Sequence, residues 1–451
     1  MSLIIFYISL ILIFSFYPIF KEIRSGKFEI FNFKNAFILY YVIQLCFSGI
    51  LSLVFSVESE TTMDLIGKSR IIYYEKAFLA ALLGIIFFNL GYSLINKKIK
   101  VPLFLSTKWQ KSNIYFVSIL YFIIGFSSLF LLIQNGGGFT QFLNDIETFR
   151  AGGLLGQGFL LYPATRLLTL AVLIIFIWTF LNVERSKVNK TIFFFLIVLS
   201  ILPATILGFR GLMLLPLINF IVVYHFLFNK INTKKFVVFG SFVLIIFVFL
   251  GVYRNIPPGI DIDTSQLIKV VEKNPELAYS FVSRSKGTEV VASVIQKLEK
   301  TGDYDLGYKA FFESLTILIP RTLWTGKPKP ASVRFTTYFF GSNLNYTRGI
   351  AKDDWGGVSP TIIGEFFWHF GWFGVIVFMF LFGIFSKILY LTFINNLNHP
   401  SIILIYAMAF TPLIMFAEAL QGNINGLMMD FFFITTTIIL LRVKISYNKS
   451  I

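Results

Sequence analysis

Long apolar runs recur along almost the whole of this 451-residue chain. A helix needs about 20 apolar residues to cross about 30 Å of hydrocarbon at about 1.5 Å per residue. Only 14% of the residues are charged, against about a quarter in soluble domains. The runs predict an all-α polytopic membrane protein with about eleven transmembrane helices. These are 2–20, 35–57, 76–95, 113–134, 158–182, 191–208, 212–228, 236–253, 361–393 (a leading segment plus a span), 401–419 and 426–442.

Basic residues divide the loops between these runs into two classes. One set holds 18 Lys and Arg residues; its segments are 21–34, 96–112, 183–190, 229–235 and the C-terminal tail. The short loops on the other side of the predicted spans hold only four Lys and Arg residues. Cytoplasmic loops carry the excess of Lys and Arg. We therefore expect the N-terminus outside and the C-terminus inside. The net charge of +16 follows largely from this asymmetry, so it does not indicate a nucleic-acid partner.

The same pattern predicts three parts. These are an N-terminal bundle of eight spans (1–253), a large, mainly helical outer loop or lid (254–360) and C-terminal membrane helices (361–451). In the outer loop, Thr288 is expected to cap a helix with one apolar stripe that ends at Gly302. Residues 307–319 are too short to span, so we expect them to lie along or dip into the membrane interface.

Several classes of site are excluded by composition. The one cysteine, Cys46, excludes a disulfide framework and a cysteine-based metal site. The three histidines are too scattered for a histidine metal site, and no GxGxxG, P-loop or HExxH motif is present. We therefore expect no metal and no cofactor.

The turn GFRG at 208–211 joins two predicted spans with almost no loop. Its Arg210 lies between two glycines, where backbone can approach a ligand closely. A guanidinium pairs with two phosphate oxygens at once, so Arg210 suits a lipid-linked diphosphate. The alternative is an anchor for lipid head groups. Arg166, inside a predicted span, either faces the bundle interior or extends to the outer interface.

Charged and aromatic residues crowd together between Ile319 and Gly374. The stretch opens with IPRTLWTGKPKP, whose prolines favour an extended, stiff backbone. Its second half, GGVSPTIIGEFFWHFGWFGV, predicts a helix with Ser359 as N-cap and Pro360 as its first residue. Glu365 and His369 follow on one face of that helix. A carboxylate there is costly unless paired, which makes Glu365 either a general base or sugar-binding group, or half of a buried ion pair.

These motifs, in this order and after the GFRG turn, resemble the Wzy-type O-antigen and oligosaccharide repeat-unit polymerases. The resemblance extends loosely to the topology, with many spans and one large outer loop late in the chain. An Arg-x10-Gly spacing described in the outer loops of some members is absent, so no residue role is carried over through it.

The resemblance implies a metal-independent membrane glycosyltransferase with a GT-C-like arrangement. It implies transfer of a growing glycan from undecaprenyl diphosphate onto the non-reducing end of a new lipid-linked repeat unit. The reaction takes place on the outer, periplasmic face of the bacterial inner membrane, in lipopolysaccharide O-antigen or related surface polysaccharide synthesis. Donor and acceptor are both undecaprenyl-diphosphate-linked oligosaccharides. A chain-length regulator and a flippase are the expected pathway partners.

Residue roles follow as hypotheses. The base candidates are Glu365, Asp353, Asp354 and His369. The residues expected to bind the diphosphate are Arg210, Arg321, Arg284, Arg348, Arg334 and Lys327. The tryptophans that suit stacking on sugars are Trp324, Trp355 and Trp368.

Two other functions stay open. A ligase would share the diphosphate arginines and transfer the glycan to a different acceptor. A transporter of lipid-linked oligosaccharides would need a polar path, but the inner halves of the predicted spans carry almost no charge, and no inverted repeat is detected.

Overall fold

The computed structural model describes most of the chain, and every regular element in that part is a helix. This confirms the predicted all-α class for the described part. The described residues are 2–50, 71–95, 105, 109–135, 137–140, 158–182, 190–207, 210–233, 236, 240, 287–319, 323–324, 326–327, 331–340 and 360–442.

Eight helical segments in this part are long and apolar enough to cross a membrane. They are Ser2–Arg24 (α1), Phe33–Ile50 (with α2, Phe33–Val42, and the π-helix η1, Ile43–Phe47), Ile71–Leu94 (α4), Lys111–Asn135 (α5), Leu160–Asn182 (end of α8, Gly158–Tyr162, then the π-helix η5, Pro163–Leu167, and α9, Leu168–Asn182), Ile362–Ile394 (α18), Pro400–Ala417 (α19, Pro400–Ile414, then the 3-10 turn η9, Met415–Ala417) and Leu420–Arg442 (α20).

Two shorter helices, α10 (Lys190–Ile206) and α11 (Arg210–Leu227), coincide with two further predicted spans. The predicted span 236–253 lies outside the described residues apart from positions 236 and 240. The multi-pass architecture is therefore present, while the count of eleven stays a prediction. The helix starts that differ most from the predicted bounds are those of α4, at Ile71 and not at 76, and of α20, at Leu420 and not at 426.

Helices α4 and α18 pack so closely that their backbones touch. A Cβ added at Gly91 would lie 2.0 Å from the carbonyl oxygen of Phe380, and one at Gly383 would lie 2.2 Å from that of Phe88. No side chain fits at either position, which is the use of small residues expected where membrane helices approach each other. Aromatic rings of both helices then fill the space beside the contact, with Phe88 and Phe382 centroids 5.6 Å apart.

Helix α15 (Gly287–Thr301) is inserted among the membrane helices. Its predicted apolar stripe is buried against α4 and α18, and the helix ends before Gly302, which has a left-handed φ of 68°. Thr288 is not a cap, because it lies inside the helix and its hydroxyl donates to the carbonyl of Leu45. That hydrogen bond ties segment 254–360, which the sequence predicts to lie outside and which is called the outer segment below, to the span that contains η1.

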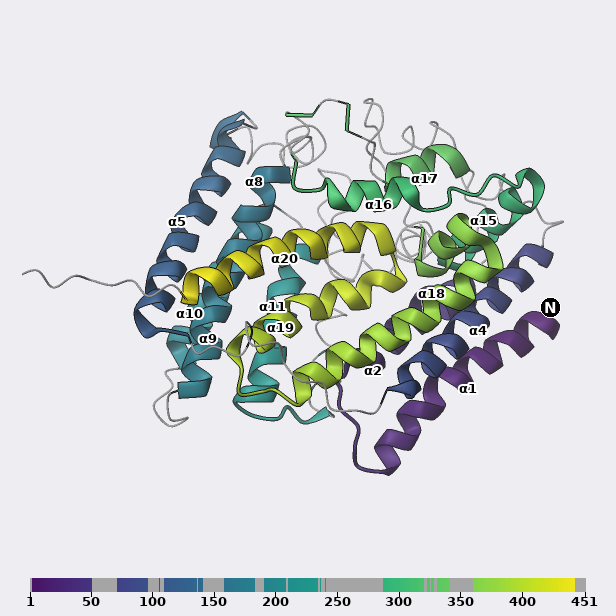
Figure 1. Cartoon of the computed structure of the whole chain (residues 1–451), viewed down its shortest axis with the longest axis horizontal. Coiled ribbons are helices and arrows are strands. Elements are labelled where there is room, and N and C mark those ends of the chain that lie inside the picture. Colours follow the sequence, from purple (N-terminus) through teal and green to yellow (C-terminus); the bar gives the residue numbers. More distant parts are fainter. Residues whose placement is uncertain are drawn as a thin grey trace, which may run out of the picture.

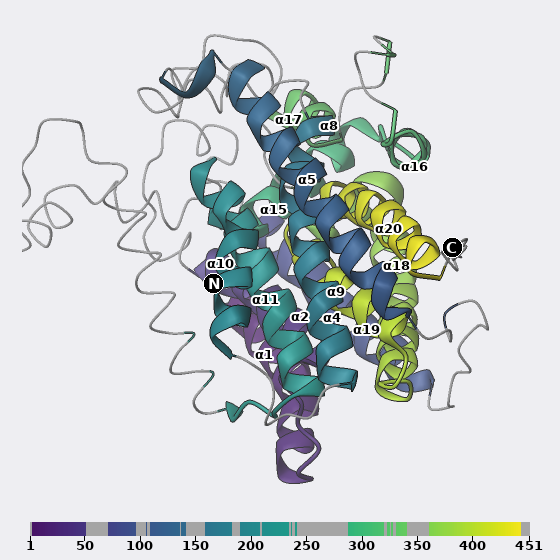
Figure 2. The same cartoon turned by 90° about the vertical axis from the view of Figure 1, so that its left-hand side faces the viewer.

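Two further helices of the outer segment lie at one end of the bundle. Helix α16 (Tyr308–Leu315) and helix α17 (Ala331–Phe340) occupy the top of both views in Figures 1 and 2. In Figure 1 α16 lies beside the part of α20 nearest its N-terminus, and Gln421 and Asn425 of that part contact α16. The described residues of this segment are thus mainly helical.

Helix α18 is divided by a kink, in agreement with the predicted leading segment plus span. Phe370 and Gly371 leave the helical region, and Gly371 takes φ 62° and ψ −147°, a conformation that only glycine adopts without strain. The helix begins at Ile362 with Thr361 as N-cap, whose hydroxyl accepts the N–H of Gly364 at 3.0 Å. The predicted cap at Ser359 was therefore wrong by two residues.

Polar contacts join the ends of α1, α2 and α11 and the loop between α1 and α2, at the opposite end of the bundle. Lys34 Nζ lies 2.5 Å from Glu22, and His225 Nε2 lies 2.8 Å from Glu29. Burial raises the pKa of Glu29, but hydrogen bonding and charge from His225 outweigh it and leave that pKa lowered. These segments carry the excess of basic residues, so the structure gathers at one end residues that the sequence assigns to one membrane face. Which face this is stays a prediction.

Candidate functional site

A buried group of polar side chains lies where α16, α17, α18 and α20 meet. It has members from four separate stretches of sequence and is called the polar cluster below. Its members are Asp305, Glu313, Ser314, Arg334, Glu365, His369, Gln421 and Asn425. Buried polar groups are costly unless paired, so this many in one place indicates a built site.

Glu365 is the most deeply buried carboxylate of the cluster, with only 1% of its surface exposed. Its two carboxylate oxygens lie 3.1 and 2.9 Å from the backbone nitrogen of Gln421, in the first turn of α20. The N-terminus of a helix carries about half a positive charge and unpaired N–H groups. Glu365 therefore satisfies the start of α20, which neither the base hypothesis nor the ion-pair hypothesis anticipated.

Amide side chains connect Glu313 with α20. The Nδ2 of Asn425 donates to Glu313 at 2.6 Å, and Gln421 Nε2 donates to Ser314 at 2.5 Å and to the carbonyl of Ala310 at 2.8 Å. The second oxygen of Glu313 accepts the backbone N–H of Ala331 at 2.8 Å, at the start of α17. Two buried glutamates thus hold the first turns of two helices.

Asp305 links an arginine and a histidine. Its Oδ1 lies 3.2 Å from Nη1 of Arg334, and its Oδ2 lies 3.4 Å from Nδ1 of His369. The Nε and Nη2 atoms of Arg334 are buried and make no hydrogen bond within the described part of the chain. The arrangement places an imidazole beside a carboxylate, and Nη2 of Arg334 lies a further 4.0 Å from Oε2 of Glu313, an ion pair without a hydrogen bond.

Aromatic rings enclose this side of the cluster. Trp368 is buried, with the guanidinium carbon of Arg334 5.8 Å from its ring centroid and Tyr338 stacked at 6.5 Å. Lys297 of α15 lies 4.2 Å from the Tyr338 ring and donates to its carbonyl oxygen. Burial lowers the pKa of Lys297, opposed by the nearby charge of Asp303.

Lys327 and Trp324, both predicted site residues, lie further along the outer segment. Lys327 Nζ donates to the carbonyl oxygens of Ile317 and Ile319 at 3.3 and 2.9 Å. These carbonyls follow α16, so Lys327 satisfies the groups beyond the end of that helix. Trp324 is half-buried.

The structure thus brings together Glu365, His369, Arg334 and Trp368 from the predicted set. Six other predicted residues lie outside the described part, namely Asp353, Asp354, Arg284, Arg321, Arg348 and Trp355. Arg210 begins α11, and its backbone alone is described. Within the described residues no three His, Cys, Asp or Glu are grouped to hold a metal ion.

A second charged site lies inside the bundle, away from the polar cluster. Arg166 is in the π-helical turn η5, and its Nε lies 3.2 Å from Oδ1 of Asp430 on α20. Both side chains are buried, so of the two alternatives for Arg166 the structure supports the bundle interior. A small pocket beside Arg166 is lined by Thr165, Thr169, Ser200, Ala204 and Pro216.

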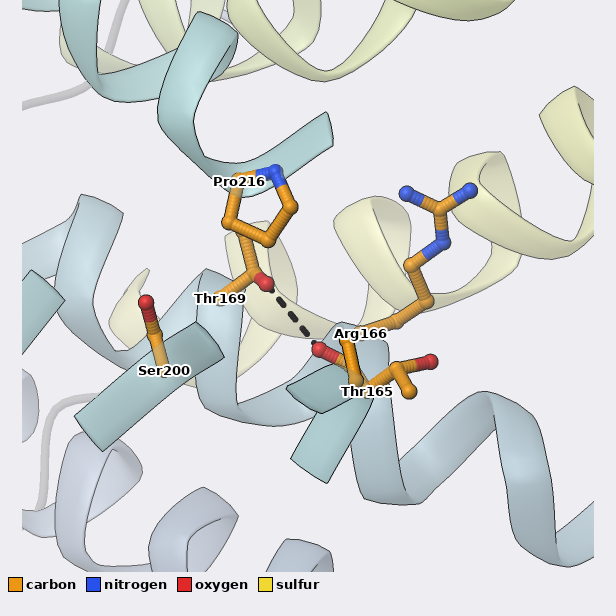
Figure 3. A pocket seen from close by; sticks show the side chains of 6 residues that line it. Thr165, Arg166, Thr169, Ser200 and Pro216 are labelled. Carbon is orange, nitrogen blue, oxygen red and sulfur yellow. Dashed lines mark hydrogen bonds between the residues drawn. The ribbon is translucent and has the colours of Figure 1, made fainter. Parts of the chain in front are cut away.

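Figure 3 shows that the guanidinium of Arg166 points away from Thr169, Ser200 and Pro216. The pocket hydroxyls are occupied by helix carbonyls, with Thr169 donating to Thr165 and Ser200 to Ile197. The pocket is therefore a gap between packed helices and not a polar binding site.

Sequence reasoning missed Asp305, Glu313, Gln421, Asn425 and Asp430. Two of them carried a signal. Glu313 is a lone carboxylate in the apolar stretch FFESLTILI, and Asp430 is a lone charge within a span, where a charge usually faces a partner. The two amides and Asp305 carried none, because they lie in ordinary polar turns of the sequence.

No family model, curated protein or solved structure matches this chain.

Proposed function

We propose that this chain is a membrane glycosyltransferase that polymerises lipid-linked repeat units, as the resemblance to Wzy-type polymerases implies. The donor is a glycan on undecaprenyl diphosphate, and the acceptor is a new repeat unit on the same lipid. A GT-C-like arrangement in the bacterial inner membrane, with the active site on the outer face, is part of the proposal. The multi-pass helical bundle is compatible with it.

One observation carries the proposal. Asp305, His369 and Arg334 lie together at the end of the bundle that also holds α16 and α17. His369 Nδ1 lies 3.4 Å from Asp305 without a hydrogen bond between them, and an imidazole next to a carboxylate suits removal of a proton from a hydroxyl. A guanidinium whose Nε and Nη2 make no hydrogen bond in the described part of the chain, and whose Nη2 lies 4.0 Å from Glu313, suits the oxygens of a diphosphate.

His369 is the favoured base among the four candidates. Both oxygens of Glu365 face the first turn of α20, which gives that carboxylate a structural role. Asp353 and Asp354 lie outside the described residues. In the proposed reaction the acceptor hydroxyl oxygen attacks the anomeric carbon of the donor, His369 takes the hydroxyl proton, and the bond to the diphosphate breaks.

Positive charge stabilises the leaving diphosphate. Arg334 contributes from the polar cluster, and Arg210, Arg321, Arg284 and Arg348 are proposed to contribute from the outer turn and the outer segment. Preorganised charge of this kind often lowers the barrier of an enzymatic reaction more than any other single effect. In the proposal no metal ion takes part, since arginines neutralise the diphosphate.

The test is a reaction of the purified protein in detergent with its cognate undecaprenyl-diphosphate repeat unit and a chelator, read on a gel. A ladder spaced by one repeat is the expected result. No ladder but transfer to an added lipid A core would replace the proposal by a ligase. Scrambling of the lipid in liposomes without either product would replace it by a transporter.

A further inference from the structure

Helix α16 has its polar face inside the protein and its apolar face outside. Ala310, Glu313 and Ser314 are buried at positions i, i+3 and i+4, and they form the contacts with α20 and α17. Glu313 is only 3% exposed. A surface helix in water has the opposite arrangement, with its apolar stripe toward the core.

The outward face of α16 is a continuous apolar surface. Large exposed side chains lie on the helix at Tyr308, Phe311, Phe312 and Leu315, spaced by three, one and three residues along one stripe. Phe311 is 66% exposed. Leu318, Ile319 and Leu323, which follow the helix in the sequence, are also exposed. A contiguous patch of this kind marks an interaction surface and not an ordinary water-exposed one.

This patch adjoins the exposed side of a candidate membrane span. On α20, Gln421 and Asn425 contact α16, and the same helical stripe continues with Met428 and Phe432 at spacings of three and four residues. Met428 and Phe432 are exposed apolar side chains of a helix long enough to cross the membrane. Helix α16 therefore covers the polar first turns of α20, and the exposed apolar stripe of α20 begins directly after them.

We propose that the apolar face of α16 is seated in the hydrocarbon of the membrane, as an extension of the lipid-facing surface of α20. The position of α16 beside α20 at one end of the bundle agrees with this (Figure 1). The helix is then the wall between lipid and the polar cluster. A lipid-linked substrate with its chain in that leaflet has its head group at the level of the cluster.

The chain offers a simple way to test this. Its one cysteine, Cys46, is buried, so a Cys46→Ala background allows one spin label at a time. Labels at Phe311→Cys, Phe312→Cys and Leu315→Cys are measured in liposomes for collision with O2, which concentrates in lipid, and with a water-soluble nickel chelate. We expect all three to collide more with O2 than with the chelate.

Matched positions calibrate the measurement. Phe431→Cys, exposed on the span α20, should behave in the same way as α16, whereas Lys300→Cys, exposed at the end of α15, should favour the chelate. Chelate preference at the α16 labels would make the helix a water-facing lid and overturn the proposal. Low collision with both probes would overturn it too, because it would mean that a protein surface or second copy covers α16. Three separate labels keep the test decisive if one variant fails to fold, and none of them depends on glycan transfer.

Discussion

Glu365 and Asp430 are both buried carboxylates with partners that involve α20, but the partners differ. Glu365 accepts a backbone N–H from the first turn of the helix, whereas Asp430 lies on the helix further along and pairs with Arg166. A helix N-terminus supplies about half a positive charge, and an arginine supplies a whole one. The carboxylate nearer the end of the bundle is thus held by dipoles, and the one deeper among the spans is held by a cation.

The difference separates two tasks. Backbone and amide N–H groups hold Glu365 and Glu313, and Nη2 of Arg334 lies 4.0 Å from Glu313 as a further, longer contact. In the same polar cluster, Asp305 is the member that holds both Arg334 and His369. The comparison therefore assigns Glu365 and Asp430 to holding helices together, and it leaves His369 as the described group best placed to move a proton.

The largest effect is expected at His369. The change His369→Gln keeps a side chain that donates toward Asp305 but cannot take up a proton. Because general-base catalysis is typically worth about 10²–10⁴-fold, the elongation rate should fall by that factor. The measurement is the rate at which the repeat-unit ladder forms, per folded protein. The control is His399→Gln, at the N-cap of α19, which should leave the rate unchanged. An unchanged rate in His369→Gln would remove His369 as the base.

The Arg166–Asp430 pair is expected to give the largest loss of stability. Asp430→Asn keeps the shape of the side chain and leaves a buried arginine without its counter-charge, which should cost about 3–5 kcal/mol of unfolding free energy. Equilibrium unfolding in mixed micelles measures this. In the double variant Arg166→Met with Asp430→Leu most of the loss should disappear, since both charges are gone. A single-variant loss below about 1 kcal/mol would mean that water reaches the pair.

Local rules account for most of the fold. Apolar runs of span length predicted ten segments that the structure shows as helices, because length and hydrophobicity are properties of each segment alone. The stripe of α15 and the shared face of Glu365 and His369 follow from helical periodicity in the same way. These features need no knowledge of what lies beside them.

Long-range partners account for what the sequence did not predict. The sequence predicted a loop at the polar start of α20, because Gln421 and Asn425 are residues that usually face solvent. Their partners lie on α16, more than 100 residues earlier in the chain. Asp305 was missed for the same reason, because Arg334 and His369 approach it from two other segments. Three of the eight cluster members were predicted, namely Glu365 and His369 on α18 and Arg334 on α17.

A smaller loss is expected at Glu365. In Glu365→Gln one oxygen still accepts the N–H of Gln421, but an amide NH2 replaces the other and faces the same donor. Leaving such a group unsatisfied costs about 1–3 kcal/mol. The loss should be smaller than in Asp430→Asn under the same unfolding conditions, and the rate per folded protein should stay within a few-fold of the original. A loss of activity as large as in His369→Gln would instead make Glu365 the base and end the division drawn above.

The smallest effect is expected on α16, where the dipolar network can be weakened without touching a charge. Ser314 accepts from Gln421 at 2.5 Å, so Ser314→Ala removes one partner from a buried amide and should cost about 0.5–1.5 kcal/mol. The matched control is Thr316→Ala, just after the same helix, whose hydroxyl donates to carbonyls of α16 itself. That change should cost clearly less, in the same unfolding experiment. Equal losses in the two variants would mean that the contact between α16 and α20 adds little, and that lipid on the outer face of α16 holds the helix in place instead.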